Sequence, residues 1–237
     1  MSNRDGGRPD QRGVHALSDA YVADYAALDP IMATYLGIPG NEQDLTDYSP
    51  DGHLARAELS ARAVRHIEAA QPADATERVA QAVFAERGGV TREVHDAGLD
   101  LGALNVTFSP VQHLREVFDL MPTGTEEDWS AVAVRLGRVP QALTGLRASL
   151  DRAADTGTVT AARQVVRVAE QCETWAGLRG APSYFESFTD PARQNGTSGT
   201  LLAALDSGVR AAAGAVAGFA GCLRVVRGPR APAVVAV

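Results

Sequence analysis

Apolar residues recur at spacings of three and four along nearly the whole chain, and this pattern constrains the fold more than any other feature. Such spacing places the apolar side chains on one face of an α-helix. The clearest stripe consists of Val159, Ala162, Val165, Val166, Ala169, Cys172 and Trp175. Strand-like alternation is short and isolated. The sequence therefore predicts an all-α fold, an irregular bundle of many helices.

Capping residues followed by proline mark the start of several helices. Asp29-Pro30, Ser49-Pro50 and Ser109-Pro110 each join a side chain that can accept a helix N–H to a ring that suits the first helical turn. Gln112 follows Ser109 by three residues, which is the spacing of a capping box. Helices are therefore expected to begin at these three points.

Glycines and other prolines predict where helices end or break. We expect a short helix ended by Gly37, a loop over residues 38–48, and a helical segment over 76–104 that is interrupted at Gly88-Gly89. Thr125 is expected to begin one helix and Pro140 the next. A polar loop around residues 195–196 then precedes a last helix from about residue 200.

Charge and cysteine content restrict the function. The net charge is −7, and the 22 basic residues, all arginine, are spread along the chain. A nucleic-acid surface needs concentrated basic residues, so nucleic acid is not an expected partner. The two cysteines, Cys172 and Cys222, form neither a disulfide framework nor a Cys-x-x-Cys metal pair.

The terminal segments predict a cytoplasmic protein without a membrane partner. Residues 1–13 are polar and glycine-rich and lack the apolar core of a signal peptide, so they are expected to form a disordered tail. The longest apolar run, residues 211–223, is shorter than the roughly 18 residues that span a bilayer.

Three segments resemble, in order and spacing, the domain-of-unknown-function family 885. They are DPIMATYLG with LTDYSPDG (29–37 and 45–52), NVTFSPVQHLREVFDLMPT (105–123) and VAEQCETWAG (168–177). The resemblance covers roughly residues 14 to 219. It implies an N-terminal part of a larger helical fold that is similar to zinc metallopeptidases.

The resemblance also implies which chemistry this chain lacks. Metallopeptidase activity in such proteins depends on a His-Glu-x-x-His helix, in which two histidines bind zinc and the glutamate acts as a base. The 237 residues do not contain this motif, and their histidines include no pair spaced for a helical metal site: His15, His53, His66, His95 and His113. The expectation is therefore no catalytic residue, metal or cofactor in this chain, with zinc implied only for full-length family members.

Arg115, Glu116 and Asp119 are the candidate site residues. They form the polar edge of the helix after Ser109 and could line a substrate cleft that the missing half completes. The alternative is an ordinary i,i+4 pair of Arg115 with Asp119 on a solvated face. His113 with Glu116, and Glu93 with His95, are weak ligand pairs for which simple packing or solvation is the alternative.

After residue 221 the chain departs from the family pattern and becomes CLRVVRGPRAPAVVAV. We expect a helical domain over 14–221 and an aberrant low-complexity tail over 222–237, from a frameshift, an early stop, a gene-call artefact or a short paralogue. Apolar faces left uncovered would promote self-association or pairing with the missing C-terminal half. A stand-alone helical interaction module and an enzyme with an unrecognised site remain the alternatives.

Overall fold

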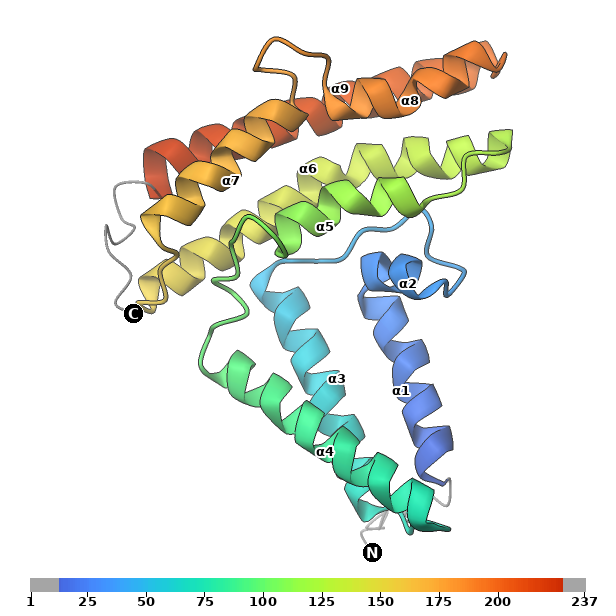
Figure 1. The fold of residues 1–237 in the computed structure, drawn as a ribbon, viewed down its shortest axis with the longest axis vertical. Helices are drawn as coiled ribbons and strands as arrows, with labels where there is room; N and C mark the ends of the chain where they lie inside the picture. Colours follow the sequence, from blue (N-terminus) through green and yellow to red (C-terminus); the bar gives the residue numbers. More distant parts are fainter. Residues whose placement is uncertain (1–12, 228–237) are drawn as a thin grey trace, which may run out of the picture.

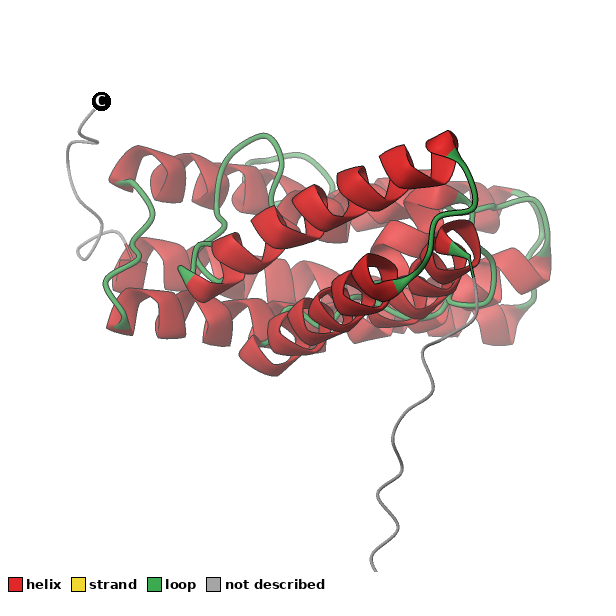
Figure 2. Ribbon diagram, turned by 90° about the horizontal axis from the view of Figure 1, so that it is seen from below, coloured by secondary structure: helices red, strands yellow, loops and turns green. Residues whose placement is uncertain are grey.

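The computed structural model describes residues 13–227, which form nine α-helices and contain no strand (Figures 1 and 2). The helices are α1 (Val14–Leu28), α2 (Pro30–Leu36), α3 (Pro50–Ala69), α4 (Ala75–Asp96), α5 (Pro110–Glu116), α6 (Glu126–Asp155), α7 (Ala162–Trp175), α8 (Tyr184–Gln194) and α9 (Gly199–Cys222). A 3₁₀ turn, Val117–Leu120, follows α5. The predicted all-α fold is confirmed.

The helices lie in two groups (Figure 1). The long helices α6 and α9 pack along each other, and α5, α7 and α8 run in similar directions beside them. Helices α1, α3 and α4 pack together and extend steeply away from this bundle, with α2 at the junction. The residues of the candidate site described below lie at the junction between the groups.

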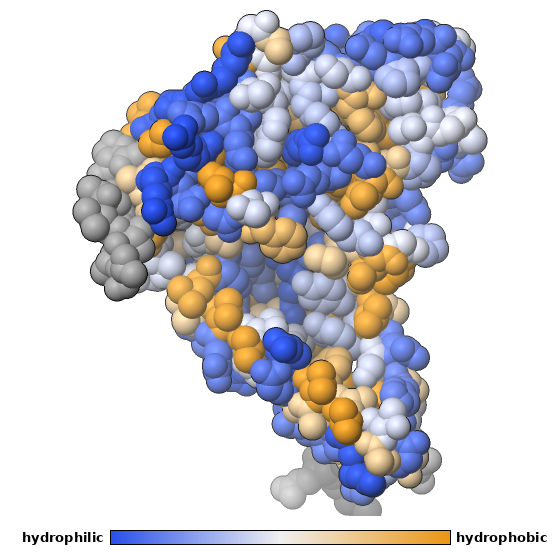
Figure 3. Space-filling model, viewed as in Figure 1, coloured by the Kyte–Doolittle hydropathy of each residue, from blue (hydrophilic) through white to orange (hydrophobic). Residues whose placement is uncertain are grey.

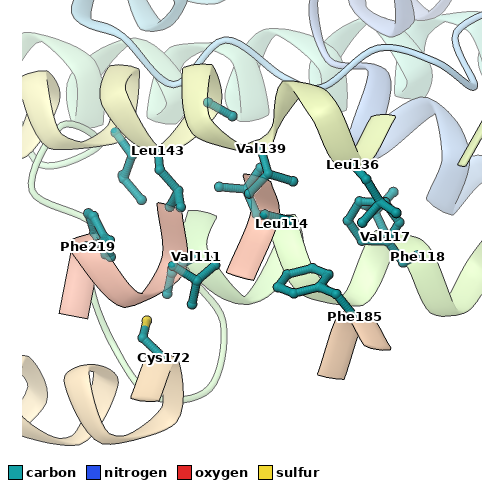
Figure 4. Packing of buried hydrophobic residues seen from close by; sticks show 14 of the residues in the cluster. Val111, Leu114, Val117, Phe118, Leu136, Val139, Leu143, Cys172, Phe185 and Phe219 are labelled. Carbon is teal, nitrogen blue, oxygen red and sulfur yellow. The ribbon is translucent and has the colours of Figure 1, made fainter. Parts of the chain in front are cut away.

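The main core fills the bundle around α6. Figure 4 shows buried side chains converging from five helices and the 3₁₀ turn, among them Val111, Leu114, Val117, Phe118, Leu136, Val139, Leu143, Cys172, Phe185 and Phe219. A separate small core joins α1 to α3 through Val14, Leu17 and Ile67. The extended helices thus have little core of their own.

Two of the three predicted helix starts have the expected caps. The Asp29 carboxylate accepts the Met32 N–H at 3.0 Å, and the Ser49 hydroxyl accepts the Gly52 N–H at 3.2 Å. Gly37 ends α2 in the left-handed region, with φ of 69°, as glycine at this position permits.

The capping box predicted at Ser109 is wrong, although α5 begins there. The Ser109 hydroxyl donates to the Gln112 side chain and makes no cap bond to the backbone. The buried Gln112 amide in turn donates to the Gln171 side chain of α7 at 2.9 Å. Gln112 therefore links the Ser109 hydroxyl to α7 and does not bond to the Ser109 backbone N–H as a capping box requires.

Two predicted interruptions are absent from the structure. Helix α4 continues through Gly88-Gly89 and ends at Asp96, well before residue 104. Helix α6 is continuous over 30 residues with Pro140 in its interior. Proline removes one helical hydrogen bond, but Val139 and Leu143 on either side are buried in the core, and their packing holds the helix together.

Helix α8 lies in a segment where no helix was predicted. Its start carries a complete capping box: the Ser183 hydroxyl accepts the Glu186 N–H, and the Glu186 carboxylate accepts the Ser183 N–H. The Ser-x-x-Glu spacing in the sequence could have revealed this helix.

Arg135 joins the junction to the bundle. Its side chain is fully buried in α6 and donates to the carbonyls of Asn41 and Asp44 at 2.9 Å and to the Thr34 hydroxyl at 3.1 Å. Burial lowers the pKa of this guanidinium to about 10. The hydrogen bonds fix α2 and the loop after it against α6.

The expected tails lie largely outside the described residues, which exclude 1–12 and 228–237. Within the segment 222–237, the chain continues from α9 as a π-helical turn, Leu223–Arg227, and Leu223 is buried. Arg224 pairs with Glu173 of α7. The described part of this segment therefore packs on the bundle.

One helix in the described chain, over Gly199–Val225, is long and apolar enough to cross a membrane by length and composition alone. The same stretch supplies core residues Leu205, Val209, Ala212, Val216 and Phe219. Core helices of globular proteins share this composition, so length and composition alone do not indicate a membrane span. The expectation of no membrane partner stays a prediction.

Candidate functional site

A cavity of about 450 Å³ lies at the junction, enclosed by α1, α2, α3, α4, α5 and the loop before α5. Its walls are mostly apolar and aromatic. The polar side chains that line it include His53, Arg56, His95, Asp100 and His113. A concave, largely apolar space with a few polar groups is the usual form of a small-molecule site.

Two histidines from different helices share one carboxylate in the cavity wall. The Oδ2 atom of Asp100 lies 2.8 Å from Nδ1 of His95 on α4 and 3.3 Å from Nδ1 of His53 on α3. Burial raises the pKa of Asp100, but the hydrogen bonds from His53 and His95 outweigh burial and lower that pKa to about 2. Asp100 is therefore an ionised acceptor that orients both rings.

Two imidazole nitrogens at this cavity lack a hydrogen-bond partner among the described residues: Nε2 of His53 and Nε2 of His113. The His53 side chain is only 10% exposed. The His113 ring packs against the edge of Phe108, with ring centroids 4.3 Å apart, and burial lowers its pKa. Buried polar atoms are normally paired, so these two unpaired atoms identify the cavity as a candidate binding site.

The other buried charges of the cavity wall already have partners. Asp29 accepts hydrogen bonds from the Met32 N–H and the Thr46 hydroxyl. Arg56 donates to the carbonyl of Asp47 at 2.7 Å. These two side chains support the wall and leave the histidines as its unsatisfied groups.

The three residues predicted from the sequence lie together, but none lines this cavity. Arg115 and Asp119 form the i,i+4 ion pair at 2.8 Å. The Tyr184 hydroxyl of α8 donates to Asp119 at 2.7 Å, and the Arg115 guanidinium stacks on the Tyr184 ring. On the other side, the Tyr35 hydroxyl of α2 donates to Glu116 at 3.1 Å.

These contacts connect α5 and the following turn to α2 and α8. A role of Arg115, Glu116 and Asp119 in a substrate cleft stays a prediction. Of the two weak ligand pairs, His95 bonds to Asp100, and His113 packs on Phe108. Within residues 13–227, no three His, Cys, Asp or Glu side chains are grouped as metal ligands.

Sequence reasoning missed the arrangement of His53, His95 and Asp100. The two histidines stand on different helices, and the packing of α3 on α4 brings them together. His95 and Asp100 are five residues apart across the end of α4, a spacing that alone indicates no site. Only the tertiary structure reveals the shared carboxylate.

Helix α4 also presents an apolar face outward. Val79, Val83, Val90 and Val94 are exposed, from 64% at Val79 to 37% at Val94. Figure 3 shows a band of hydrophobic residues, in orange, over the region of α4. With 100° per residue, the four fall within an arc of about 60°. Glu86 and Glu93 border one side of the arc, and Arg87 borders the other.

The comparisons with known proteins identify the family of the chain. Residues 30–234 match the family described as "Bacterial protein of unknown function (DUF885)". The chain matches no curated protein. The match includes nearly all of the three segments that carry the resemblance in the sequence. The chain belongs to the DUF885 family.

Proposed function

We propose that this chain is a helical protein-interaction module from a zinc-peptidase-like protein and that it does not hydrolyse peptides by itself. The observation that carries the proposal is the valine stripe on α4. The opposite side of α4 packs on α3 through Gly88, so the helix is already anchored. A rigid helix with a second apolar face is suited to receive another helix.

The partner that we propose for this stripe is a second copy of the chain. In a parallel two-fold pair of α4 helices, each valine of the stripe meets its own counterpart. The acidic border of one helix then faces the basic border of the other, so Glu86 of one copy lies near Arg87 of its partner. In an antiparallel pair, by contrast, like borders meet and repel. The charge pattern therefore favours parallel pairing.

In a single copy of the chain, Glu86 and Arg87 pair with each other, and they can exchange this contact for one with a second copy. Glu86 and Arg87 contact each other at 3.1 Å within one copy, but both side chains are more than half exposed. Exposed ion pairs contribute little to stability, at most about 1 kcal/mol. Exchanging this contact for one across the interface therefore costs little.

The absence of peptide hydrolysis is the second part of the proposal. It rests on the family resemblance, because the 237 residues do not contain His-Glu-x-x-His. Purified chain with added Zn²⁺ is expected to release no product from a mixed peptide substrate. Turnover that a chelator abolishes and zinc restores would contradict this part.

Sedimentation velocity over a concentration series tests the interaction. The wild type is expected to shift from monomer to dimer, and Val90→Glu should stay monomeric at the same concentrations. Val166→Glu on α7 is the matched control, since Val166 is 41% exposed and Val90 is 44% exposed. A wild type that stays monomeric, or a control that weakens the dimer equally, would overturn pairing through α4.

Charge reversal tests the parallel arrangement. Glu86→Arg and Arg87→Glu are each expected to weaken the dimer, and the double variant should restore it. In an antiparallel pair the double variant would only exchange one set of like charges for another. A dimer with no rescue in the double variant would reject parallel pairing while retaining the α4 interface.

A further inference from the structure

We propose that the cavity at the junction of α3, α4 and α5 binds a small apolar molecule that carries a primary ammonium group. The inference starts from other side chains than the interaction through α4, although Val90 and Val94 belong both to the valine stripe and to the cavity wall. It begins from the two buried nitrogens, Nε2 of His53 and Nε2 of His113, that have no partner among the described residues. Both histidines line the same cavity.

The hydrogen bond of His53 determines what its free nitrogen can do. Because Nδ1 faces the ionised Asp100 carboxylate, that nitrogen carries a proton, and in the Nδ1–H tautomer that this contact selects, Nε2 is an acceptor. Burial also favours the neutral ring of His113. Nε2 of His53 therefore requires a hydrogen-bond donor from a ligand, and an ammonium group supplies three N–H groups.

The charges in the wall favour a cation over a neutral donor. Two carboxylates, Asp29 and Asp100, and one guanidinium, Arg56, line the cavity. Among these three side chains the carboxylates outnumber the guanidinium by one. Aromatic rings attract cations through their faces, and the wall contains Tyr25, Tyr48 and Phe108.

The rest of the cavity wall suits the apolar part of such a ligand. Ile31, Val90 and Val94 contribute aliphatic side chains to the wall, and the volume of about 450 Å³ lies in the range of small-molecule sites. An arylalkylamine combines an apolar body with the required cationic donor. A molecule with a carboxylate at the same position would meet acceptors and a like charge.

Calorimetric titration of the full chain at pH 7.5 with three probes that share a phenylethyl body tests this ligand class. 2-Phenylethylamine is expected to bind, 2-phenylethanol to bind at least about 10-fold more weakly, and 3-phenylpropionate not to bind. The factor corresponds to the loss of a hydrogen bond to a charged group. No binding of the amine at millimolar concentration, or equal binding of all three probes, would overturn the proposal.

A variant locates the site. His53→Phe keeps the ring volume and removes the unpaired nitrogen, and we expect it to weaken amine binding at least about 10-fold. His15→Phe, at an exposed position of α1 outside the cavity, is the control. Unchanged affinity in folded His53→Phe, checked by circular dichroism, would overturn the assignment. If His53→Phe does not fold, the comparison of the three probes on the wild type still decides the ligand class.

A titration with Zn²⁺ alone distinguishes the proposed amine site from a metal site at the same residues. The proposal expects no stoichiometric binding that depends on His53. Zinc bound at one equivalent in the wild type and lost in His53→Phe would replace the amine site with a metal site.

Discussion

Gly88 of α4 lies directly against Val64 of α3. A Cβ atom on Gly88 would come within 2.2 Å of the valine Cγ2 atom, whereas a Cβ atom on the neighbouring Gly89 would meet nothing within 4 Å. The glycine therefore permits the close approach of the two helices that bear His53 and His95. This approach places both rings on one carboxylate.

Gly88→Ala is expected to lower the free energy of unfolding by about 1 kcal/mol. Alanine gains about 1 kcal/mol of helix propensity over glycine, but overpacking against Val64 costs roughly 1–3 kcal/mol. Gly89→Ala is the control and should stabilise the protein by up to about 1 kcal/mol. Urea denaturation of both variants checks the difference, and equal stabilisation by both would show that α3 and α4 can separate without cost.

Arg135→Met is expected to destabilise the fold by about 3 kcal/mol or more, because it leaves several buried carbonyl groups without donors. Arg138→Met is the control. Arg138 pairs with Asp44 near the surface, and an exposed pair contributes at most about 1 kcal/mol. Thermal and urea denaturation measure both variants, and similar losses in the two would contradict the special role of the buried guanidinium.

The shared carboxylate makes stability sensitive to acid. The pKa of Asp100 is about 2 in the folded state against an ordinary value of 3.8, so its stabilisation is fully present above about pH 4 and is lost as the pH falls toward 2. The loss expected from this group is about 2 kcal/mol. Unfolding measured between pH 5 and pH 2 should be less acid-dependent in Asp100→Asn than in the wild type. Asp119→Asn serves as the control, and an unchanged pH profile in Asp100→Asn would contradict the assignment.

Pro140→Ala is expected to raise the free energy of unfolding by about 1–3 kcal/mol. Alanine restores the backbone N–H that proline removes from α6 and has a far higher helix propensity. The change should appear as a higher denaturation midpoint in urea with an unaltered slope. A lower midpoint would show that packing of the proline ring outweighs the restored hydrogen bond.

The sequence predicts the parts of this fold that local interactions determine. Local sequence predicts the caps at Asp29 and Ser49 and the apolar stripes of α5 and α6. This is possible because a helix start and a helix face are properties of a few neighbouring residues. The predicted breaks at Gly88 and Pro140 are wrong because tertiary packing overrides local preference at both positions. A glycine needed for helix contact has the same appearance in the sequence as one that ends a helix.

The candidate site was less predictable because tertiary packing, and not local sequence, brings its residues together. Arg115 and Asp119 were expected either at a cleft or as an i,i+4 pair, and the structure contains the pair. The junction of His53, His95 and Asp100 depends on the crossing of α3 and α4, which no local pattern specifies. The buried hydrogen bonds of Arg135 could not be predicted either. One arginine within an apolar helix face does not indicate which carbonyl groups will surround it.

The separation of Arg135 from its acceptors has a consequence for biosynthesis. Its acceptors on Thr34, Asn41 and Asp44 precede it by 91 to 101 residues. At roughly 5–20 residues per second, α2 and its loop leave the ribosome about 5–20 seconds before their hydrogen-bond donor is made. Throughout this interval the first segment of the chain has no anchor on α6. Nascent α2 and its loop therefore keep these polar groups without their buried partner until α6 emerges.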